Sequence, residues 1–337
     1  MLLIASPYDA FMMEEDGRVE EQLYFEYVSL NLSSPPRVTR VSHIADAIEA
    51  MAQKHFDLVI AMPGGDLTET FEGAKELKGM SGDTPIVVLT PFSREVTRRI
   101  SHEDHSGVDY VFSWLGNVDL LLAIIKLLED KMNADNDILE VGVQAIMLVE
   151  DSVRFYSSVL PHIYKFLLKQ SREFSTEALN VHEQMLRMRG RPKVILARDY
   201  EEALELYGRY GKNMLGVITD VSFKHEGAKD RKAGLTLAAY LRAKDPTLPI
   251  IVESTESENR VHVKEFGGVF IDKNSKKLSV DLGKEIRNNF GFGEFVLHDP
   301  VSGDSVGTIG SVNELQKRIF SIPDEVLFYH CQRNELS

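Results

Sequence analysis

Polar side chains that can do chemistry stand directly after short apolar segments in the second half of the chain. They are Glu150 and Asp151 after 145–149, Asp220 after 214–219, Ser254 after 250–253 and Lys273 after 269–272. If these segments are neighbouring parallel strands, their carboxyl ends meet at one edge of a sheet, and so do these side chains. Clustered carboxylates repel one another unless a cation neutralises them, and an all-oxygen site suits a hard ion such as Mg²⁺. The sequence therefore predicts a magnesium site that handles phosphoryl groups.

Asp220 is the predicted nucleophile of this site. A carboxylate can attack phosphorus and form an acyl phosphate, which is a form of nucleophilic catalysis. The hydroxyl group of Ser254 and the ammonium group of Lys273 would then stabilise the transferred oxygens. We therefore expect phosphoryl transfer to a carboxylate.

Short apolar segments alternate with helical patterns, which is typical of a parallel sheet flanked by helices. The expected strands cover 2–5, 38–41, 58–61, 86–89 and 110–112, then 145–149, 194–197, 215–218, 250–252 and 269–271. The two sets align, because 56–62 matches 214–220 and 85–90 matches 249–254. The pattern therefore predicts an α/β protein with an internal duplication.

The chain length of 337 residues fits two domains, at roughly 150 residues per domain. We predict a first domain at 1–133, a polar linker at 134–142, a second domain at 143–290 and the start of a C-terminal region at 291–337. The second domain departs from the repeat because a heptad-like apolar stripe runs from Leu160 to Met188. This stripe predicts a long helix at 153–189, kinked near Pro161, that supports a homodimer. The alternative is two shorter helices that fold back on their own domain.

Four motifs in the second domain resemble those of a response-regulator receiver domain. They are Val149-Glu150-Asp151-Ser152, Ile218-Thr219-Asp220, Pro249-Ile250-Ile251-Val252-Glu253-Ser254 and Ile271-Asp272-Lys273. The resemblance implies a flavodoxin-like, doubly wound sheet of five parallel strands in each copy. It also implies that Asp220 is the phosphoacceptor, and that Glu150, Asp151, Asp220 and the backbone carbonyl of Ser222 hold Mg²⁺. Ser254 would be the switch hydroxyl, Lys273 would pair with the phosphoryl group, and Phe270 stands at the aromatic switch position.

The second domain departs from the receiver pattern at three places. Asn274 replaces the usual proline after the lysine, and Glu253 places a carboxylate beside Ser254. The loop from Ser222 to Ala233 is long and contains Lys224, Lys229, Arg231 and Lys232.

The first domain keeps the strands and loses the chemical groups. Met62 stands at the acceptor position, Ser6-Pro7 replace the acidic pair, and Ser113 replaces the lysine; only Thr90 remains. Asp9 and Asp66 are nearby acids, but neither stands at the expected strand end. We therefore predict a pseudo-receiver that serves protein contacts.

Composition and charge exclude several classes of protein. The net charge is −14, and acidic side chains outnumber basic ones most strongly in residues 1–137, so nucleic acid is not an expected partner. A single cysteine, Cys331, fits a reducing compartment. The sequence has neither a long apolar segment nor a basic N-terminal leader, which predicts a cytoplasmic protein without a membrane partner.

Residues 291–337 predict a connection to a further domain. The segments 289–295 and 322–330 are similar to the stretch that follows paired receivers in bacterial proteins. Those proteins continue into an ATP-binding domain of the phosphoenolpyruvate synthase or pyruvate phosphate dikinase type. We expect any such catalysis to lie beyond residue 337, because the chain has no nucleotide-binding loop and is not itself predicted to be an enzyme.

Two functions remain open at the level of sequence. The first is a two-component phosphorelay module, in which a histidine kinase or phosphotransfer protein donates a phosphoryl group to Asp220 in the presence of Mg²⁺. The second is a scaffold whose two receiver-like domains bind proteins independently of phosphorylation.

Overall fold

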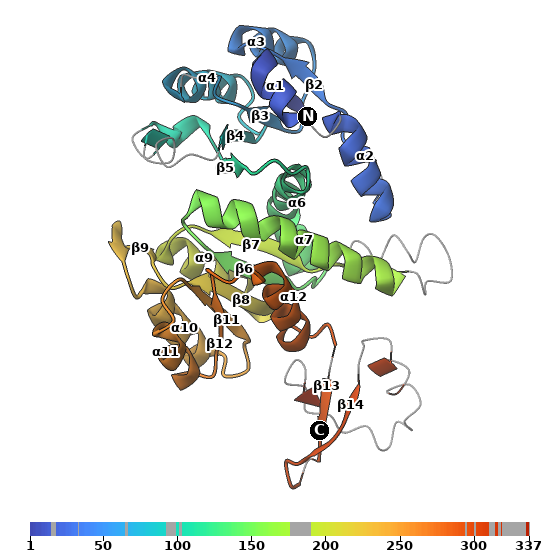
Figure 1. Ribbon diagram of the computed structural model, residues 1–337, viewed down its shortest axis with the longest axis vertical. Coiled ribbons are helices and arrows are strands. Elements are labelled where there is room, and N and C mark those ends of the chain that lie inside the picture. The colour runs from blue at the N-terminus through green and yellow to red at the C-terminus, as the bar shows by residue number, and fades with distance from the viewer. Residues whose placement is uncertain are drawn as a thin grey trace. The chain divides into compact units, whose positions relative to one another are not determined.

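A computed structural model shows the fold of the protein (Figure 1). It describes residues 1–14, 18–32, 34–64, 67–91, 99–100, 103–175, 190–293, 295–299, 301–309, 314–315, 318 and 335–336. Four sequence features lie outside these residues: Asp66, the predicted end of the long helix at 176–189, the segment 322–330 and Cys331.

The first sheet contains five parallel strands in the order β2-β1-β3-β4-β5. The strands are β1 (Leu2–Ile4), β2 (Thr39–Val41), β3 (Val59–Ala61), β4 (Ile86–Pro91) and β5 (Tyr110–Trp114). The helices around it are α1 (Pro7–Met13), α2 (Val19–Ser29), α3 (Ile44–Gln53), α4 (Leu67–Met80) and α6 (Asp119–Ala134). The central strands are almost wholly apolar because both faces of the sheet are buried.

The second sheet repeats this arrangement in the order β12-β11-β8-β6-β7. Its strands are β6 (Ala145–Val149), β7 (Lys193–Ala197), β8 (Met214–Asp220), β11 (Ile250–Ser254) and β12 (Val269–Asp272). Its helices are α7 (Val153–Ser175), α9 (Tyr200–Tyr210), α10 (Ala233–Lys244), α11 (Asn259–Glu265) and α12 (Leu278–Asn289). Figure 1 shows α7 and α12 on one face of the sheet and α10 and α11 toward the other.

Both sheets follow the strand order 2-1-3-4-5 of flavodoxin-like folds. The expectation of two doubly wound α/β sheets in tandem is therefore confirmed. Packing requires a glycine at position 216 of β8, because a Cβ there would lie 2.4 Å from the ring of Phe290. The order also creates a topological switch point between β6 and β8, and the ends of these two strands are where a ligand site is expected.

Helix α7 is shared between the two compact units of the chain. One unit contains 1–129 together with 152–165, and the other contains 130–151 together with 166–337. Within the first unit, the backbone N–H of Ser113 donates to the Ser157 hydroxyl at 2.9 Å, and the Tyr156 hydroxyl donates to the carbonyl of Val111. The first two turns of α7 are therefore hydrogen-bonded to the edge strand β5 within this unit.

The described part of the predicted long helix does not expose its apolar stripe. Leu160, Ile163 and Leu167 are each fully buried, and Pro161 lies inside the continuous helix α7. These side chains are covered by the chain itself, which removes them from the surface expected to form a homodimer. The rest of that surface, at 176–189, lies outside the described residues.

The segment 134–142, the linker of the sequence analysis, contains buried and paired side chains. Helix α6 continues as a π-helix at Asp135–Glu140, and Ile138 on it is fully buried. Asp137 pairs with the ammonium group of Lys193 at 2.7 Å. An apolar anchor and an ion pair therefore fix the segment to the second unit.

Residues after the second sheet form a smaller sheet in the described part of the C-terminal region. Its strands are β13 (Phe295–His298), β14 (Ser305–Ile309) and β15 (Glu335–Leu336), in the order β14-β13-β15. None of the helices in the described ranges is both long and apolar enough to cross a membrane.

Candidate functional site

The ends of β6 and β8 bring three carboxylates together. Glu150 and Asp151 follow β6, Asp220 ends β8, and these two strands are neighbours in the second sheet. One oxygen of each carboxylate lies within 4.8 Å of the others. The cluster predicted from the sequence is therefore present, at the switch point of the sheet.

Lys273 binds the inner side of this cluster. Its Nζ contacts Oε2 of Glu150 and lies 2.8 Å from Oδ1 of Asp220. Burial acts to lower the pKa of Lys273, but the charges of Glu150 and Asp220 outweigh burial and raise it. Lys273 therefore remains an ammonium ion, which offsets part of the negative charge around the predicted acceptor.

Asp220 stays accessible at the open side of the cluster. Its side chain is 16% exposed, whereas that of Glu150 is 2% exposed. Helix α10 begins very close behind the acceptor strand, because a Cβ at Gly234 would lie 1.8 Å from the carbonyl oxygen of Asp220. A glycine is therefore needed at position 234 for α10 to pack here. The partly exposed carboxylate of Asp220 can still be reached from solvent.

Ser254 ends β11, beside the acceptor strand. The register pairs Glu253 with Asp220, so Ser254 lies one position further along. Its Oγ accepts hydrogen bonds from the backbone N–H of Glu256 at 3.1 Å and from Nδ2 of Asn259 at 3.0 Å. Because these bonds use Oγ as the acceptor, the hydroxyl hydrogen of Ser254 can still be donated to a phosphoryl oxygen.

Phe270, at the predicted aromatic switch position on β12, is half-buried. The guanidinium group of Arg260, on α11, lies 4.8 Å from the centre of its ring. This cation–π contact joins β12 to α11.

Glu253 is a buried carboxylate next to the site. Burial raises its pKa to about 7, the charge of Asp220 adds to the rise, and Lys273 opposes it. Among the described residues, no hydrogen-bond partner is found for its Oε1. Burial therefore favours the neutral form of this carboxyl group more strongly than it is favoured in an ordinary glutamate.

Lys229 is the residue whose place in the site the sequence did not reveal. The loop after β8 forms a hairpin of β9 (Phe223–His225) and β10 (Ala228–Asp230), which carries Lys229 to the acidic cluster. Its Nζ lies 2.9 and 2.8 Å from the two carboxylate oxygens of Asp151 and 2.5 Å from the backbone carbonyl of Ser222. The only signal in the sequence was the basic character of this loop.

The residues present fit a hard divalent cation. The donor set consists of carboxylate oxygens and the carbonyl of Ser222, and oxygen ligands are those that Mg²⁺ prefers. The ammonium group of Lys229 already occupies a cation position between Asp151 and Ser222, which shows that these oxygens converge on one point. Glu150, Asp151, Asp220 and Ser222 would therefore hold the ion.

The corresponding strand ends of the first unit carry no such groups. Met62 follows β3 and is buried, and Ser6 caps α1 by accepting from the backbone N–H of Asp9 at 3.1 Å. The Thr90 hydroxyl donates to the carbonyl of Phe112 at 3.2 Å. These contacts are structural, and no cluster of metal-binding acids is found at this edge among the described residues.

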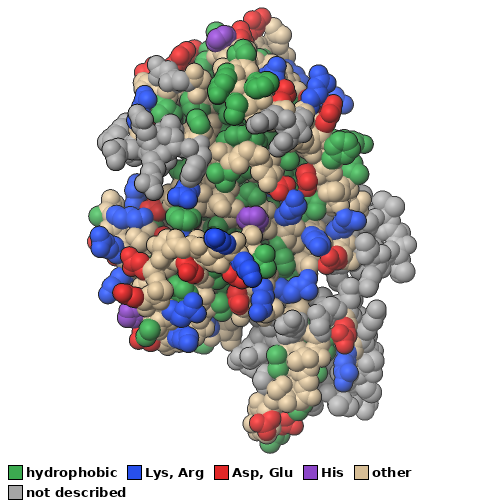
Figure 2. Space-filling view, viewed as in Figure 1, with side chains coloured by type: hydrophobic (Ala, Val, Ile, Leu, Met, Phe, Trp, Pro, Cys, Tyr) green, Lys and Arg blue, Asp and Glu red, His purple; other side chains and the backbone are tan. Residues whose placement is uncertain are grey.

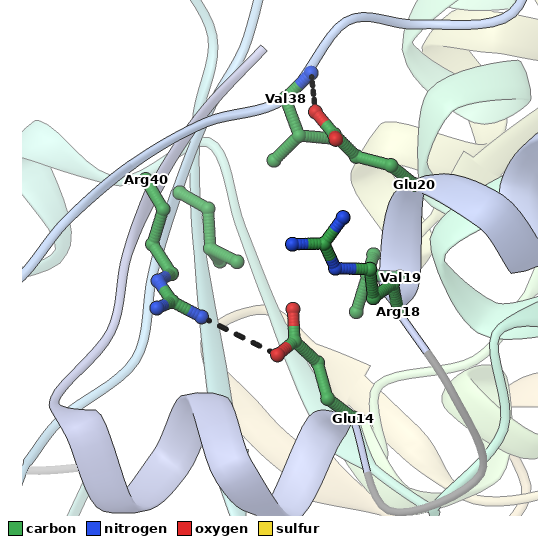
Figure 3. A pocket seen from close by; sticks show the side chains of 7 residues that line it. Glu14, Arg18, Val19, Glu20, Val38 and Arg40 are labelled. Atoms are coloured by element: carbon green, nitrogen blue, oxygen red, sulfur yellow. Dashed lines mark hydrogen bonds and ion pairs between the residues drawn. The ribbon is translucent and has the colours of Figure 1, made fainter.

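The first unit has a pocket of about 390 Å³ away from these strand ends. Figure 3 shows it between β2 and the start of α2, where Arg40 pairs with Glu14 at 3.5 Å and the backbone N–H of Val38 donates to Glu20 at 3.0 Å. Its polar lining therefore bonds largely to itself. The pocket does not include the strand ends that correspond to the acidic cluster.

The chain matches no protein-family model and no curated protein. It is similar to two solved structures described as two-component system response regulator/GGDEF domain proteins, each at 14% identity. The alignments cover 85% of this chain and 97% of those chains, with TM-scores of 0.33 and 0.34. A structure of LpoA from Haemophilus influenzae aligns at 10% identity over 84% of this chain and 45% of that chain, with a TM-score of 0.23. The strand order and the site geometry, and not these alignments, support the function proposed below.

Charged side chains on the face drawn in Figure 2 are of both signs. Lysine, arginine and acidic side chains are interspersed there over the second unit and do not form one continuous basic surface.

Proposed function

We propose that the second unit is a receiver domain of a two-component signalling system and accepts a phosphoryl group on Asp220 with the help of Mg²⁺. One observation carries this proposal: Asp220 lies 2.8 Å from the ammonium group of Lys273 and within reach of the carboxylates of Glu150 and Asp151. A nucleophile, a fixed cation and a hard-metal donor set thus stand together at the switch point of the sheet.

The proposed reaction transfers a phosphoryl group from a phosphohistidine to the carboxylate of Asp220. An oxygen of Asp220 forms the new bond to phosphorus, the bond from phosphorus to the histidine nitrogen breaks, and the imidazole leaves with a proton from solvent. A bound Mg²⁺ would neutralise charge on the transferred oxygens. Lys273 orients Asp220 and supplies a positive charge on the inner side, while the Ser254 hydroxyl donates to a phosphoryl oxygen.

The acyl phosphate would bias an equilibrium that already exists in the protein. A new hydrogen bond from Ser254 favours one arrangement of the end of β11, and Phe270 on the neighbouring β12 follows this change. The first unit would serve protein contacts. The proposed partners are a histidine kinase or phosphotransfer protein and, as output, an ATP-binding domain similar to phosphoenolpyruvate synthase. The module would act in the cytoplasm as a phosphoacceptor, not as an enzyme.

The test is phosphorylation of the full chain by acetyl phosphate, followed by intact-mass measurement. The wild type is expected to gain one phosphoryl group with Mg²⁺ and none with a chelator. Asp220→Asn removes the nucleophile and is expected to stay unlabelled, whereas Asp272→Asn, which changes a carboxylate at the end of β12, should be labelled like the wild type. An unlabelled wild type under all conditions would favour the scaffold function instead.

A further inference from the structure

We propose that Lys229 is a tethered cation that occupies the outer metal position, so that Mg²⁺ binds only by displacing it. Lys229 would then set the Mg²⁺ concentration at which the site becomes competent. This inference rests on the proposed function, because it concerns the regulation of the same site.

The contacts of Lys229 match those of a metal ion. An ammonium group has three N–H donors, and Nζ of Lys229 has three oxygen neighbours: Oδ1 and Oδ2 of Asp151 and the carbonyl oxygen of Ser222. Asp151 and Ser222 supply two of the ligands assigned to Mg²⁺. The same lone pairs cannot hold both cations, and two cations at this spacing repel each other. Binding of Mg²⁺ therefore requires Lys229 to leave.

The hairpin that carries Lys229 is held in place by contacts outside the site. Its turn residues Glu226 and Gly227 have φ angles of 52° and 76°, and such a pair of positive angles is typical of a tight two-residue hairpin turn. The backbone N–H of Glu226 donates to Glu201 on α9 at 2.9 Å, and Phe223 at the base of the hairpin is fully buried. The backbone is therefore fixed, and it holds the root of the Lys229 side chain at a constant distance from Asp151.

The side chain of Lys229 can leave without refolding of the hairpin. It is 54% exposed, so a rotation about its own bonds returns the ammonium group to water. Lys273 differs in this respect, because its side chain is 1% exposed and contacts the inner carboxylates of Glu150 and Asp220. The two lysines therefore have separate roles: Lys273 is a permanent counter-ion, and Lys229 is an exchangeable one.

Charge balance favours the exchange once Mg²⁺ is abundant. Three carboxylates face two ammonium groups before the exchange, which leaves one negative charge in excess. Replacing Lys229 by a divalent ion makes the cluster neutral. The competition makes Mg²⁺ binding weaker than it would be at the same carboxylates without the lysine.

The test is a calorimetric titration of MgCl₂ into the metal-free full chain. Lys229→Met removes the competing ammonium group and keeps an unbranched apolar side chain as long as the methylene part of lysine. Lys224→Met is the matched control, because Lys224 lies directly opposite Lys229 in the hairpin and has an exposed side chain. The Lys229 variant is expected to bind Mg²⁺ about threefold to fivefold more tightly than the wild type, as suits the loss of a half-exposed ion pair. The control should change by less than about twofold at physiological salt, where exposed charges are screened.

The outcomes separate this inference from the proposed function. If the Lys229 variant binds Mg²⁺ no more tightly than the wild type, while Asp220 of the wild type is still labelled in a Mg²⁺-dependent way, the tethered-cation role is wrong and the receiver function stands. If none of the three proteins binds Mg²⁺, both proposals are wrong. An equal gain in affinity for both lysine variants would also overturn the specific role of Lys229, since it would reflect net charge alone.

Discussion

The two sheets of this chain share a strand order and differ at the strand ends. In the second unit, the edge of the sheet carries Glu150, Asp151 and Asp220 around buried Lys273. In the first unit, the acceptor position is the buried side chain of Met62. Apolar strands are thus enough to build the scaffold, and a few residues at the strand ends decide whether it can do chemistry.

The difference also has a cost in stability. Burying charged groups is unfavourable unless they are paired, and the second unit meets this condition by placing Lys273 against Glu150 and Asp220. The first unit avoids the cost, because Thr90 and Ser113 at its strand ends are neutral and buried. Substitutions at corresponding positions should therefore have unequal effects in the two units.

The largest expected effect is that of Lys273→Met. It removes the cation between Glu150 and Asp220, and it should lower the free energy of unfolding by about 3–5 kcal/mol at pH 7, as is typical of breaking a buried ion pair. Urea denaturation of the full chain without metal measures this loss. The corresponding change in the first unit, Ser113→Ala, keeps the backbone N–H that donates to Ser157, so it should cost less than about 1 kcal/mol. Equal losses in the two units would contradict the comparison.

The next largest expected effect is a pH-dependent increase in the free energy of unfolding on Glu253→Gln. The pKa of Glu253 is about 7 in the folded protein against 4.5 for an ordinary glutamate, mainly because of burial. The folded state therefore binds the proton more tightly, and the stability that the neutral carboxyl group provides is present below pH 4.5 and is lost as the pH rises toward 7. The variant stays neutral, so it should match the wild type near pH 4.5 and be more stable by about 3 kcal/mol at pH 8.

Urea denaturation in a chelating buffer at pH 4.5, 6 and 8 measures this difference. Glu256→Gln, three residues further along and outside the strand, is the control. Its free energy of unfolding should differ from that of the wild type by the same amount at all three pH values. If Glu253→Gln raises the free energy of unfolding by an amount that does not grow with pH, Glu253 is charged throughout the range.

The smallest expected effect is that of Met62→Asp in the first unit. The change places a carboxylate at the acceptor position, but the partners that Asp220 has in the second unit, a lysine and two further acids, are not provided there. Acetyl phosphate with Mg²⁺ should therefore add no second phosphoryl group, as intact mass will show. Labelling of residue 62 would mean that the scaffold alone, without the surrounding charges, is sufficient.

The sequence predicted the strands and their convergence well for a physical reason. Fully buried parallel strands are largely apolar segments, and their ends are marked by the first charged residue, as at Glu150 and Asp220. The same rule, that the polar residues at the ends of parallel strands converge, predicted that Lys273 lies close to two carboxylates. The strand order itself came from the resemblance to receiver domains, because alternation alone does not fix which strands are neighbours.

The parts that the sequence did not reveal depend on contacts between distant segments. Lys229 reaches Asp151 only because the loop after β8 folds into a hairpin, and a run of basic residues gives no indication of that register. The start of α7 bonds to β5 through Ser157, a contact over 44 positions that no periodicity encodes. The ion pair of Asp137, in segment 134–142, with Lys193 is a further contact between distant segments that no periodicity encodes.

The most direct test of the central claim is to locate the phosphoryl group in the labelled wild type. The full chain would be treated with acetyl phosphate and Mg²⁺, the acyl phosphate reduced with borohydride, and the modified residue identified by peptide sequencing in a mass spectrometer. We expect a single modified position, Asp220. Modification of Asp151, or of any residue in 1–129, in place of Asp220 would contradict the account.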